Sequence, residues 1–206
     1  WDFYGETFYL DKNSLIPRQD TELLIDLVLK RYDKGSKLNI LDLGTGSGVI
    51  GITLSKLYPN SMITISDISS KALNVANKNI KNHNVTNIRS LESDWFDSFK
   101  EIELFDLILT NPPYISKDDD HLNNLELGYE PSNALVASKN GFADIFKIID
   151  TSPRFLNSEG LLMIEHGHTQ GNRVKNYFQQ KSFNNIKQHR DINQKIRVTS
   201  ASKIKI

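Results

Sequence analysis

Short apolar segments alternate with amphipathic segments along most of the chain. Apolar runs with the length and composition of buried strands occur at residues 38–43, 62–67, 88–91, 104–109 and 161–164. Helical spacing of apolar side chains predicts five helices. One is capped by Asp20 or Thr21, one runs from the glycines after the first strand to about Tyr58, and one is capped by Ser69 or Ser70. The other two lie at 141–156 and 170–180. This alternation predicts an α/β fold with an open, mostly parallel sheet covered by helices on both faces.

The two ends of the chain depart from this alternation. Residues 3–10 have the pattern of a short hairpin. Two strands follow each other directly at 184–189 and 196–201, which predicts a hairpin and therefore an antiparallel strand at one edge of the sheet. Residues 115–140 are too many for a routine connection, so we expect a functional lid or a disordered loop there.

Composition narrows the class of protein. The 206 residues, 38% of them hydrophobic, predict one domain with a substantial core. The chain has no cysteine, which excludes disulfides and thiolate metal sites. No stretch has the length of a membrane span and no signal-peptide pattern is present, so we expect a cytoplasmic protein that does not bind membranes.

Charge is distributed unevenly although the net charge is zero. Residues 166–206 contain nine Lys or Arg and a single acid, Asp191. One interpretation is a solvated basic edge. The other is a surface for nucleic acid or for an acidic protein partner.

A glycine-rich loop follows the first strand of the predicted sheet. It consists of Gly44, Thr45, Gly46, Ser47 and Gly48. Glycines allow a tight turn and a close approach of the backbone to a ligand, and the next helix directs N–H groups toward it. The loop therefore predicts a cofactor site.

The identity of that cofactor depends on neighbouring acids. Gly46, Gly48 and Gly51 also fit the dinucleotide pattern, so a nicotinamide or flavin enzyme is an alternative. Asp67, at the end of the second strand, is placed to accept hydrogen bonds from ribose hydroxyls with either cofactor. Asp42 favours S-adenosylmethionine, because a carboxylate beside the loop suits an ammonium and a sulfonium better than two phosphates. Capping of loop N–H groups is the alternative role for Asp42.

Two more polar segments follow strands at the same predicted edge. Asp94 and Trp95 come after the third strand, where the indole offers a flat face for adenine and the carboxylate an acceptor for its amino group. A histidine pair, His166 and His168, lies near Glu165, but no third metal ligand is evident, so we expect no metal site.

The segment after the fourth strand predicts the substrate group. It reads Asn111, Pro112, Pro113 and Tyr114. Pro112 holds Asn111 in an extended conformation, and neither proline has an N–H, so the segment offers mainly acceptors. Acceptors beside an aromatic ring suit a planar group that carries an NH2. We therefore expect Asn111, Pro112 and Tyr114 to act in catalysis and all four residues to bind the substrate.

Together these motifs resemble the class I S-adenosylmethionine-dependent methyltransferases that modify planar amino groups. Within that class, one segment is similar to the signature of the bacterial peptide-chain release factor N5-glutamine methyltransferases: Leu15, Ile16, Pro17, Arg18, Gln19, Asp20, Thr21 and Glu22. The beginning (Phe3, Tyr4, Gly5, Phe8) and the end (Arg190, Asp191, Arg197, Val198) also resemble that family. The resemblance covers nearly the whole chain.

The resemblance implies a Rossmann-like sheet, S-adenosylmethionine as cofactor and a release factor as protein substrate. The reaction it implies is methylation of the glutamine in the Gly-Gly-Gln motif. Arg18 and Thr21 are implied to hold the methionine end of the cofactor or the lid. We expect a single catalytic domain over residues 1–206, with 1–17 as a lead-in hairpin and substrate lid, without the small helical domain that normally precedes this region, and acting as a monomer.

Three alternatives stay open at the level of sequence. A nucleic-acid amino methyltransferase acting on adenine N6 or guanine N2 would use the same four-residue motif. A related family methylates a glutamine of a ribosomal protein. A chain that binds the cofactor without catalysis is the non-enzymatic alternative.

Overall fold

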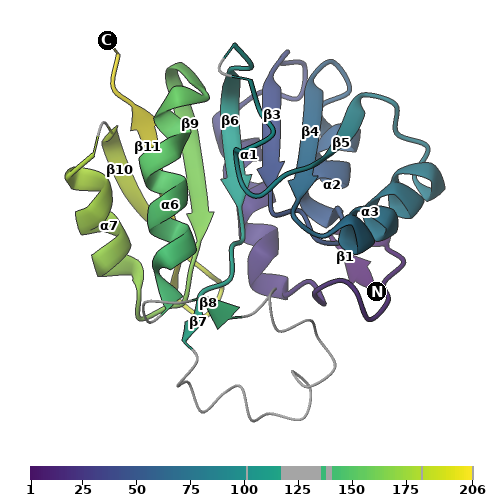
Figure 1. The fold of residues 1–206 in the computed structure, drawn as a ribbon, viewed down its shortest axis with the longest axis horizontal. Coiled ribbons are helices and arrows are strands. Elements are labelled where there is room, and N and C mark those ends of the chain that lie inside the picture. The colour runs from purple at the N-terminus through teal and green to yellow at the C-terminus, as the bar shows by residue number, and fades with distance from the viewer. Residues whose placement is uncertain (101, 117–135, 138–140, 182, 206) are drawn as a thin grey trace.

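A seven-stranded sheet forms the centre of the molecule (Figure 1). The computed structural model describes residues 1–100, 102–116, 136–137, 141–181 and 183–205. The sheet has the order β10-β11-β9-β6-β3-β4-β5. Its strands are β3 (Asn39–Leu43), β4 (Met62–Asp67), β5 (Ile88–Glu92), β6 (Phe105–Thr110), β9 (Leu156–Glu165), β10 (Phe183–Arg190) and β11 (Ile196–Lys203).

Strand directions agree with the sequence prediction. β3 pairs in parallel with β4 and β6, β4 with β5, and β6 with β9. β10 and β11 form the predicted hairpin, with β11 inserted between β9 and β10 and antiparallel to both. The prediction of a mostly parallel sheet with antiparallel pairing at its C-terminal edge is confirmed.

Helices cover both faces of the sheet, and the strands alternate their side chains between them. The helices are α1 (Glu22–Arg31), α2 (Val49–Leu57), α3 (Ser70–Asn82), α6 (Ala143–Thr151) and α7 (Gly171–Gln179), with short 3-10 turns η1 (Gln19–Thr21) and η4 (Ser152–Arg154). On β3, Ile40 packs into the core beneath α1 and α2, whereas Leu41 and Leu43 pack into the core beneath α6 and α7. Burial on both faces explains why β6 is apolar at successive positions from Leu107 to Leu109.

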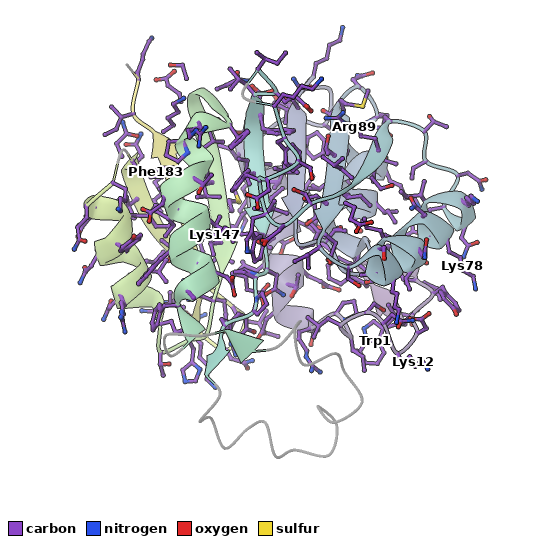
Figure 2. The ribbon with its side chains drawn as sticks, in the orientation of Figure 1. Trp1, Lys12, Lys78, Arg89, Lys147 and Phe183 are labelled. Carbon is purple, nitrogen blue, oxygen red and sulfur yellow. The ribbon has the colours of Figure 1, made fainter. Side chains whose placement is uncertain are left out.

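The N-terminal lead-in packs against the first of these cores. Its hairpin pairs β1 (Asp2–Phe3) with β2 (Glu6–Thr7), as predicted. Phe3 and Phe8 are buried in the core, and the Phe8 ring lies 4.4 Å from the ring of His83. Figure 2 labels Trp1 and Lys12 at the lower right of the view, away from Arg89 at the opposite end of the sheet.

Some local predictions need correction or fall outside the description. Strand β9 begins at Leu156, five residues before the predicted start, because Leu156 pairs with Phe105 across a bulge despite the polar residues that follow it. Thr21 precedes α1, yet its side chain makes no capping bond. The predicted loop 115–140 lies outside the described residues, except for β7 (Ile115–Ser116) and β8 (Val136–Ala137), which pair in parallel. Within the described residues no helix is both long and apolar enough to span a membrane.

Candidate active site

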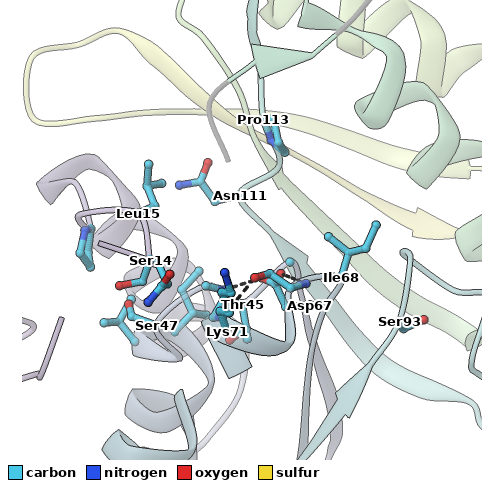
Figure 3. A pocket seen from close by; sticks show the side chains of 18 of the residues that line it. Ser14, Leu15, Thr45, Ser47, Asp67, Ile68, Lys71, Ser93, Asn111 and Pro113 are labelled. Carbon is cyan, nitrogen blue, oxygen red and sulfur yellow. Dashed lines mark hydrogen bonds between the residues drawn. The ribbon is translucent and has the colours of Figure 1, made fainter. Parts of the chain in front are cut away.

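A cavity of about 690 Å³ opens at the carboxyl ends of the central parallel strands. Segments that follow β3, β4, β5 and β6 all line it, together with residues 12–15 of the lead-in. In the close view of Figure 3, Ser14 and Leu15 lie on one side of the cavity, and Ile68 and Ser93 lie on the other. In the sheet, β4 lies on one side of β3 and β6 lies on the other, so the direction of strand order reverses at β3. Open α/β sheets bind ligands at such a switch point.

Most of the predicted site residues meet at this cavity. The ones that line it are Thr21, Gly44, Thr45, Gly46, Ser47, Asp67, Asp94, Trp95, Asn111 and Pro113. Arg18, Gly48, Pro112 and Tyr114 do not line it. The structure thus brings the ten lining residues together and leaves these four outside the lining, while the role of each residue stays a prediction.

The glycine loop uses most of its own N–H groups. Gly44 and Thr45 donate to the carbonyl of Ser66 at 2.9 and 2.8 Å, and Gly46 donates to Asp67 Oδ2 at 2.9 Å. Gly48 begins α2 with φ of 86°, and a Cβ there would approach Ala76 to 3.1 Å. Gly48 thus allows α2 to pack against α3, and the loop has few free donors for a phosphate.

Asp42 supports this loop from beneath and does not line the cavity. It is fully buried, and its Oδ2 accepts hydrogen bonds from Thr45 Oγ1 at 2.5 Å and from Gly51 N at 2.9 Å. Burial raises the pKa of Asp42 to about 6, although both hydrogen bonds oppose that rise. The placement of this carboxylate beside the cofactor ammonium is therefore wrong, and Asp42 instead holds a hydroxyl of the loop and an N–H group in the first turn of α2, not the loop N–H groups that the alternative expected.

Asp67 stands at the cavity end of β4, as predicted. Its Oδ2 accepts from Gly46 N, and its Oδ1 accepts from Ser69 N at 2.8 Å. Burial raises the pKa of Asp67, and these backbone hydrogen bonds oppose the rise. The carboxylate is thus held rigidly with lone pairs still available to a ligand hydroxyl.

Trp95 lines the cavity in a conformation that non-glycine residues rarely adopt, with φ of 50°. Its carbonyl accepts from Ser93 Oγ at 2.8 Å, and its Nε1 donates to Asp144 Oδ1 at 3.2 Å. Asp94 pairs with Lys147 at 3.1 Å. Strained backbone held by several contacts is typical of a ligand-binding position.

Asn111 has a defined orientation. Its Nδ2 donates to Thr21 Oγ1 at 3.2 Å, which holds the side-chain amide at the cavity wall through its nitrogen. Farther along the motif, the carbonyl of Tyr114 accepts from Gln170 Nε2 at 3.0 Å. A Cβ on Gly141 would lie 2.1 Å from that carbonyl, so only glycine fits beside it. Both ends of the four-residue motif are therefore fixed by other parts of the chain.

The segment 18–22 contacts three other regions of the molecule: the motif that begins at Asn111, strand β11 and the N-terminal lead-in. Thr21 binds Asn111, Asp20 Oδ2 pairs with Arg197 at 3.0 Å, and Glu22 Oε1 accepts from Tyr4 N at 2.8 Å. Arg18 lies before η1 and does not reach the cavity lining. The role of Arg18 toward the cofactor or the lid stays a prediction, whereas Thr21 lies at the cavity itself.

Several lining residues were not predicted from the sequence. Ser14, Leu15, Ile68, Lys71 and Asp144 all border the cavity. Ile68 is 60% exposed, an unusual position for a large apolar side chain, and it follows Asp67 directly. Ile68 directly follows the end of β4, and this position could have indicated it from the sequence. Ser14 and Asp144 reach the cavity only through tertiary packing.

The histidine pair near Glu165 has a structural explanation for one member. His166 is buried, with Nε2 2.8 Å from Thr199 Oγ1 and Nδ1 3.0 Å from the carbonyl of Gly167. Burial lowers the pKa of His166. No cluster of three or more potential metal-ligating side chains is present among the described residues.

Sequence comparisons with known proteins indicate the class of protein to which this chain belongs. Residues 19–127 match the model of the Methyltransferase small domain. The chain is 40% identical over 200 residues to the release factor glutamine methyltransferase of Francisella tularensis, covering 97% of this chain and 70% of that protein. It is 37% identical over 198 residues to the protein of the same name from Escherichia coli, covering 96% and 71%.

Solved structures share the fold at low identity. A methyltransferase from Pyrococcus furiosus superimposes with a TM-score of 0.71 at 17% identity, covering 98% of this chain and 90% of that one. The 16S rRNA N2 G1207 methyltransferase of Thermus thermophilus, in complex with AdoMet and guanosine, superimposes with a TM-score of 0.69 at 16% identity, covering 91% and 44%.

Sheet order, glycine loop and family match together define a methyltransferase with a Rossmann-like fold. This class excludes the alternative of a nicotinamide or flavin enzyme. Within this class, the chain belongs to the family of release factor glutamine methyltransferases.

Proposed function

We propose that this chain transfers a methyl group from S-adenosylmethionine to the side-chain amide nitrogen N5 of the glutamine in the Gly-Gly-Gln motif of peptide-chain release factors. One observation carries the proposal. Asn111 is held through Nδ2 by Thr21, which leaves Oδ1 as a fixed acceptor at the cavity wall. A fixed acceptor is what an amide NH2 needs for binding in one orientation.

The cavity fits S-adenosylmethionine better than a dinucleotide. Its volume lies within the usual range of about 300–1,000 Å³ for small-molecule sites. A pyrophosphate needs free N–H donors, but those of Gly44, Thr45 and Gly46 are already bonded. Asp67 offers an acceptor for ribose hydroxyls, and Ile68 with Trp95 offers apolar surface for adenine.

The residues of the motif would prepare the acceptor amide. An amide nitrogen is a poor nucleophile because its lone pair is delocalised into the carbonyl. Asn111 Oδ1 and the Pro112 carbonyl would each accept one N–H, which fixes the nitrogen and raises its electron density. When bound, the cofactor supplies an electrophilic methyl group. Positioning of two reactants in this way contributes up to about 7–11 kcal/mol to lowering the barrier.

Proton removal needs no strong base here. An amide nitrogen that has gained a methyl group is very acidic and loses its proton readily. Tyr114 is not suited to act as a base, because burial raises the pKa of its phenol further above neutrality. Its proposed role is to pack against the amide plane and exclude water.

The basic C-terminal region gives little support to a nucleic-acid substrate. Five of its nine Lys and Arg side chains contact other parts of the protein: Arg173 lies over Phe142, Lys181 pairs with Asp150, Arg190 donates to Gln194, Arg197 pairs with Asp20 and Asp191, and Lys203 donates to Leu156. We therefore favour the release factor as partner. We also propose that the enzyme acts as a monomer in the cytoplasm, and that the end of the lead-in, residues 12–15 and Pro17, covers the cavity.

Mass spectrometry tests this proposal. The protein is incubated with S-adenosylmethionine and, separately, with a release factor, ribosomal RNA, DNA and ribosomal protein. We expect one methyl group on the release factor, mapped to the glutamine of the Gly-Gly-Gln peptide, and none on a release factor whose glutamine is replaced by glutamate. Methylation of RNA, DNA or ribosomal protein without the release factor would overturn the proposal.

A further inference from the structure

Helix α6 holds the segment that follows β5 at the cavity wall. Trp95 Nε1 donates a hydrogen bond to Asp144 Oδ1 at 3.2 Å. Lys147, one helical turn farther along α6, pairs with Asp94 at 3.1 Å. Trp95 has a φ of 50°, a conformation that persists where surrounding contacts hold it. The indole is therefore fixed from α6, and Asp144 is the residue of this helix that lines the cavity.

The Trp95 ring extends from α6 to the glycine loop. A Cβ on Gly44 would lie 3.2 Å from Trp95 Cζ3 and 3.6 Å from Cη2, so the six-membered end of the indole packs against Gly44. Nε1 lies on the opposite edge of the ring, where it meets Asp144. Ile68 and Ser93 lie together on one side of the cavity (Figure 3). A flat base that packs between Ile68 and this indole would have the Asp144 carboxylate beside one edge.

Asp144 keeps hydrogen-bonding capacity at the cavity. A carboxylate has about four lone-pair sites, and Trp95 is the hydrogen-bond partner of Asp144 among the described residues. The side chain is half-buried, and burial raises its pKa while the hydrogen bond from Trp95 opposes the rise. Asp94 is more exposed and is already paired with Lys147, so water competes for any further hydrogen bond that it offers. Asp144 is thus the better-placed acceptor at this wall.

We propose that Asp144 is a cofactor-binding residue that selects the base: Oδ1 holds Trp95 in place, and Oδ2 accepts a hydrogen bond from the exocyclic amino group of adenine. This inference rests on the proposed function, because it requires S-adenosylmethionine in this cavity. It assigns to Asp144 the contact that the sequence indicated for Asp94. Hypoxanthine carries an oxygen in place of the amino group, and two acceptors that face each other form no hydrogen bond.

An acid at this point of α6 also has a purely structural explanation. Asp144 lies in the first turn of the helix, where a negative charge is favourable near the N-terminus. That explanation predicts lower stability for a neutral variant and no change in the choice between bases. The two explanations therefore differ in ligand discrimination.

Calorimetric titration with two ligands tests the inference without reference to activity. S-adenosylhomocysteine carries the adenine amino group, and S-inosylhomocysteine carries an oxygen in its place. We expect the wild type to bind the adenine compound at least about tenfold more tightly, as for a hydrogen bond to a charged group. Equal affinities would overturn the inference from the wild type alone, whether or not a variant folds.

The variant Asp144→Asn separates the two roles of the carboxylate. The Asn oxygen can still accept from Trp95 Nε1, which places an NH2 group where Oδ2 was. We expect the preference for the adenine compound to fall at least about tenfold or to reverse, because the NH2 group suits the oxygen of the inosine compound. Asp97→Asn, at an exposed position of the same segment that does not line the cavity, is the matched control and should keep the wild-type preference. An unchanged preference in Asp144→Asn would count against the inference.

Tryptophan fluorescence supplies the second measurement. The chain has two tryptophans, so a Trp1→Phe background leaves Trp95 as the single emitter. In the absence of ligand, we expect Asp144→Asn to keep the emission maximum of this background and Asp144→Leu to shift it, because leucine cannot accept from Nε1. An unshifted maximum in Asp144→Leu would show that Asp144 does not hold the indole, contrary to the inference.

The outcomes separate this inference from the proposed function. If S-adenosylhomocysteine binds with the expected preference while no release factor is methylated, the proposed function fails and the role of Asp144 survives. If the release factor is methylated and Asp144→Asn leaves the preference unchanged, the role of Asp144 alone fails. A chain that binds neither compound contradicts both.

Discussion

Thr21 and Asn111 are 90 positions apart in the chain, and the Thr21 hydroxyl accepts a hydrogen bond from the Asn111 side chain at 3.2 Å. This contact joins the family signature at residues 18–22 to the motif that follows β6. It holds the Asn111 amide through its nitrogen. In the proposed function, the signature segment would therefore affect the reaction through Asn111.

Two substitutions of Thr21 distinguish the effect of its hydroxyl group from the effect of its side-chain volume. We expect Thr21→Val, which keeps the volume and loses the hydroxyl, to lower kcat about five- to tenfold, because one hydrogen bond of about 1 kcal/mol no longer orients Asn111. Thr21→Ser should restore most of the rate. Steady-state kinetics with saturating cofactor make the comparison, and equal rates for the valine and serine variants would contradict it.

Asp67 should govern cofactor affinity with little effect on the chemical step. Charged hydrogen bonds contribute about 1.5–3 kcal/mol, so we expect Asp67→Ala to weaken binding of S-adenosylmethionine at least about tenfold. Glu92, its register partner on β5, does not line the cavity, and Glu92→Ala is the matched control. Titration calorimetry measures both variants. Similar affinities for the two would show that Asp67 does not contact the cofactor.

Asn79 should contribute to the stability of the fold. It is fully buried on α3, where Nδ2 donates to the carbonyls of Tyr9 and Ser47, and Oδ1 accepts from Tyr9 N. Asn79→Ala leaves these backbone groups unpaired, so we expect a loss of at least about 2 kcal/mol in the free energy of unfolding. Urea denaturation measures it, and Asn77→Ala on the same helix should change it by less than about 0.5 kcal/mol.

Stability should depend on pH through Glu165. Its folded pKa is raised from 4.5 to about 7, so its contribution is fully present below the unfolded pKa and is lost as pH rises through about 7. Asp42, raised to about 6, acts in the same direction. We expect Glu165→Gln to gain up to about 3 kcal/mol relative to wild type between pH 5 and pH 8. Denaturation curves across this range test it, and a pH-independent difference would contradict it.

The strand pattern could be predicted from the sequence because the central strands are buried on both faces. In β6 the side chains from Leu107 to Leu109 are apolar at successive positions, and in β3 only Asp42 interrupts the apolar run from Ile40 to Leu43. The start of β9 could not be predicted in this way. Asn157, Ser158 and Glu159 interrupt the apolar run, and only pairing between Leu156 and Phe105 reveals the longer strand.

The site was predictable where a residue directly follows a strand, because carboxyl ends of parallel strands meet at one edge. Gly44 and Asn111 directly follow β3 and β6, and Asp67 is the last residue of β4. Asp42 was placed wrongly because a side chain one position before a strand end can point into the core as easily as toward the ligand. The link from Thr21 to Asn111 depends on how η1 packs against the end of β6, which local sequence does not encode.

The most direct test of the account is methylation of a release factor by the wild type and by Asn111→Ala, followed by peptide mass spectrometry and by measurement of cofactor affinity. The account predicts one methyl group on the Gly-Gly-Gln glutamine with the wild type. It predicts a rate lower by a factor of at least about 100 with Asn111→Ala, as for loss of a single preorganised hydrogen bond in other enzymes, and a cofactor Kd within several-fold of wild type. Equal losses of rate and cofactor affinity, or an unchanged rate, would contradict it.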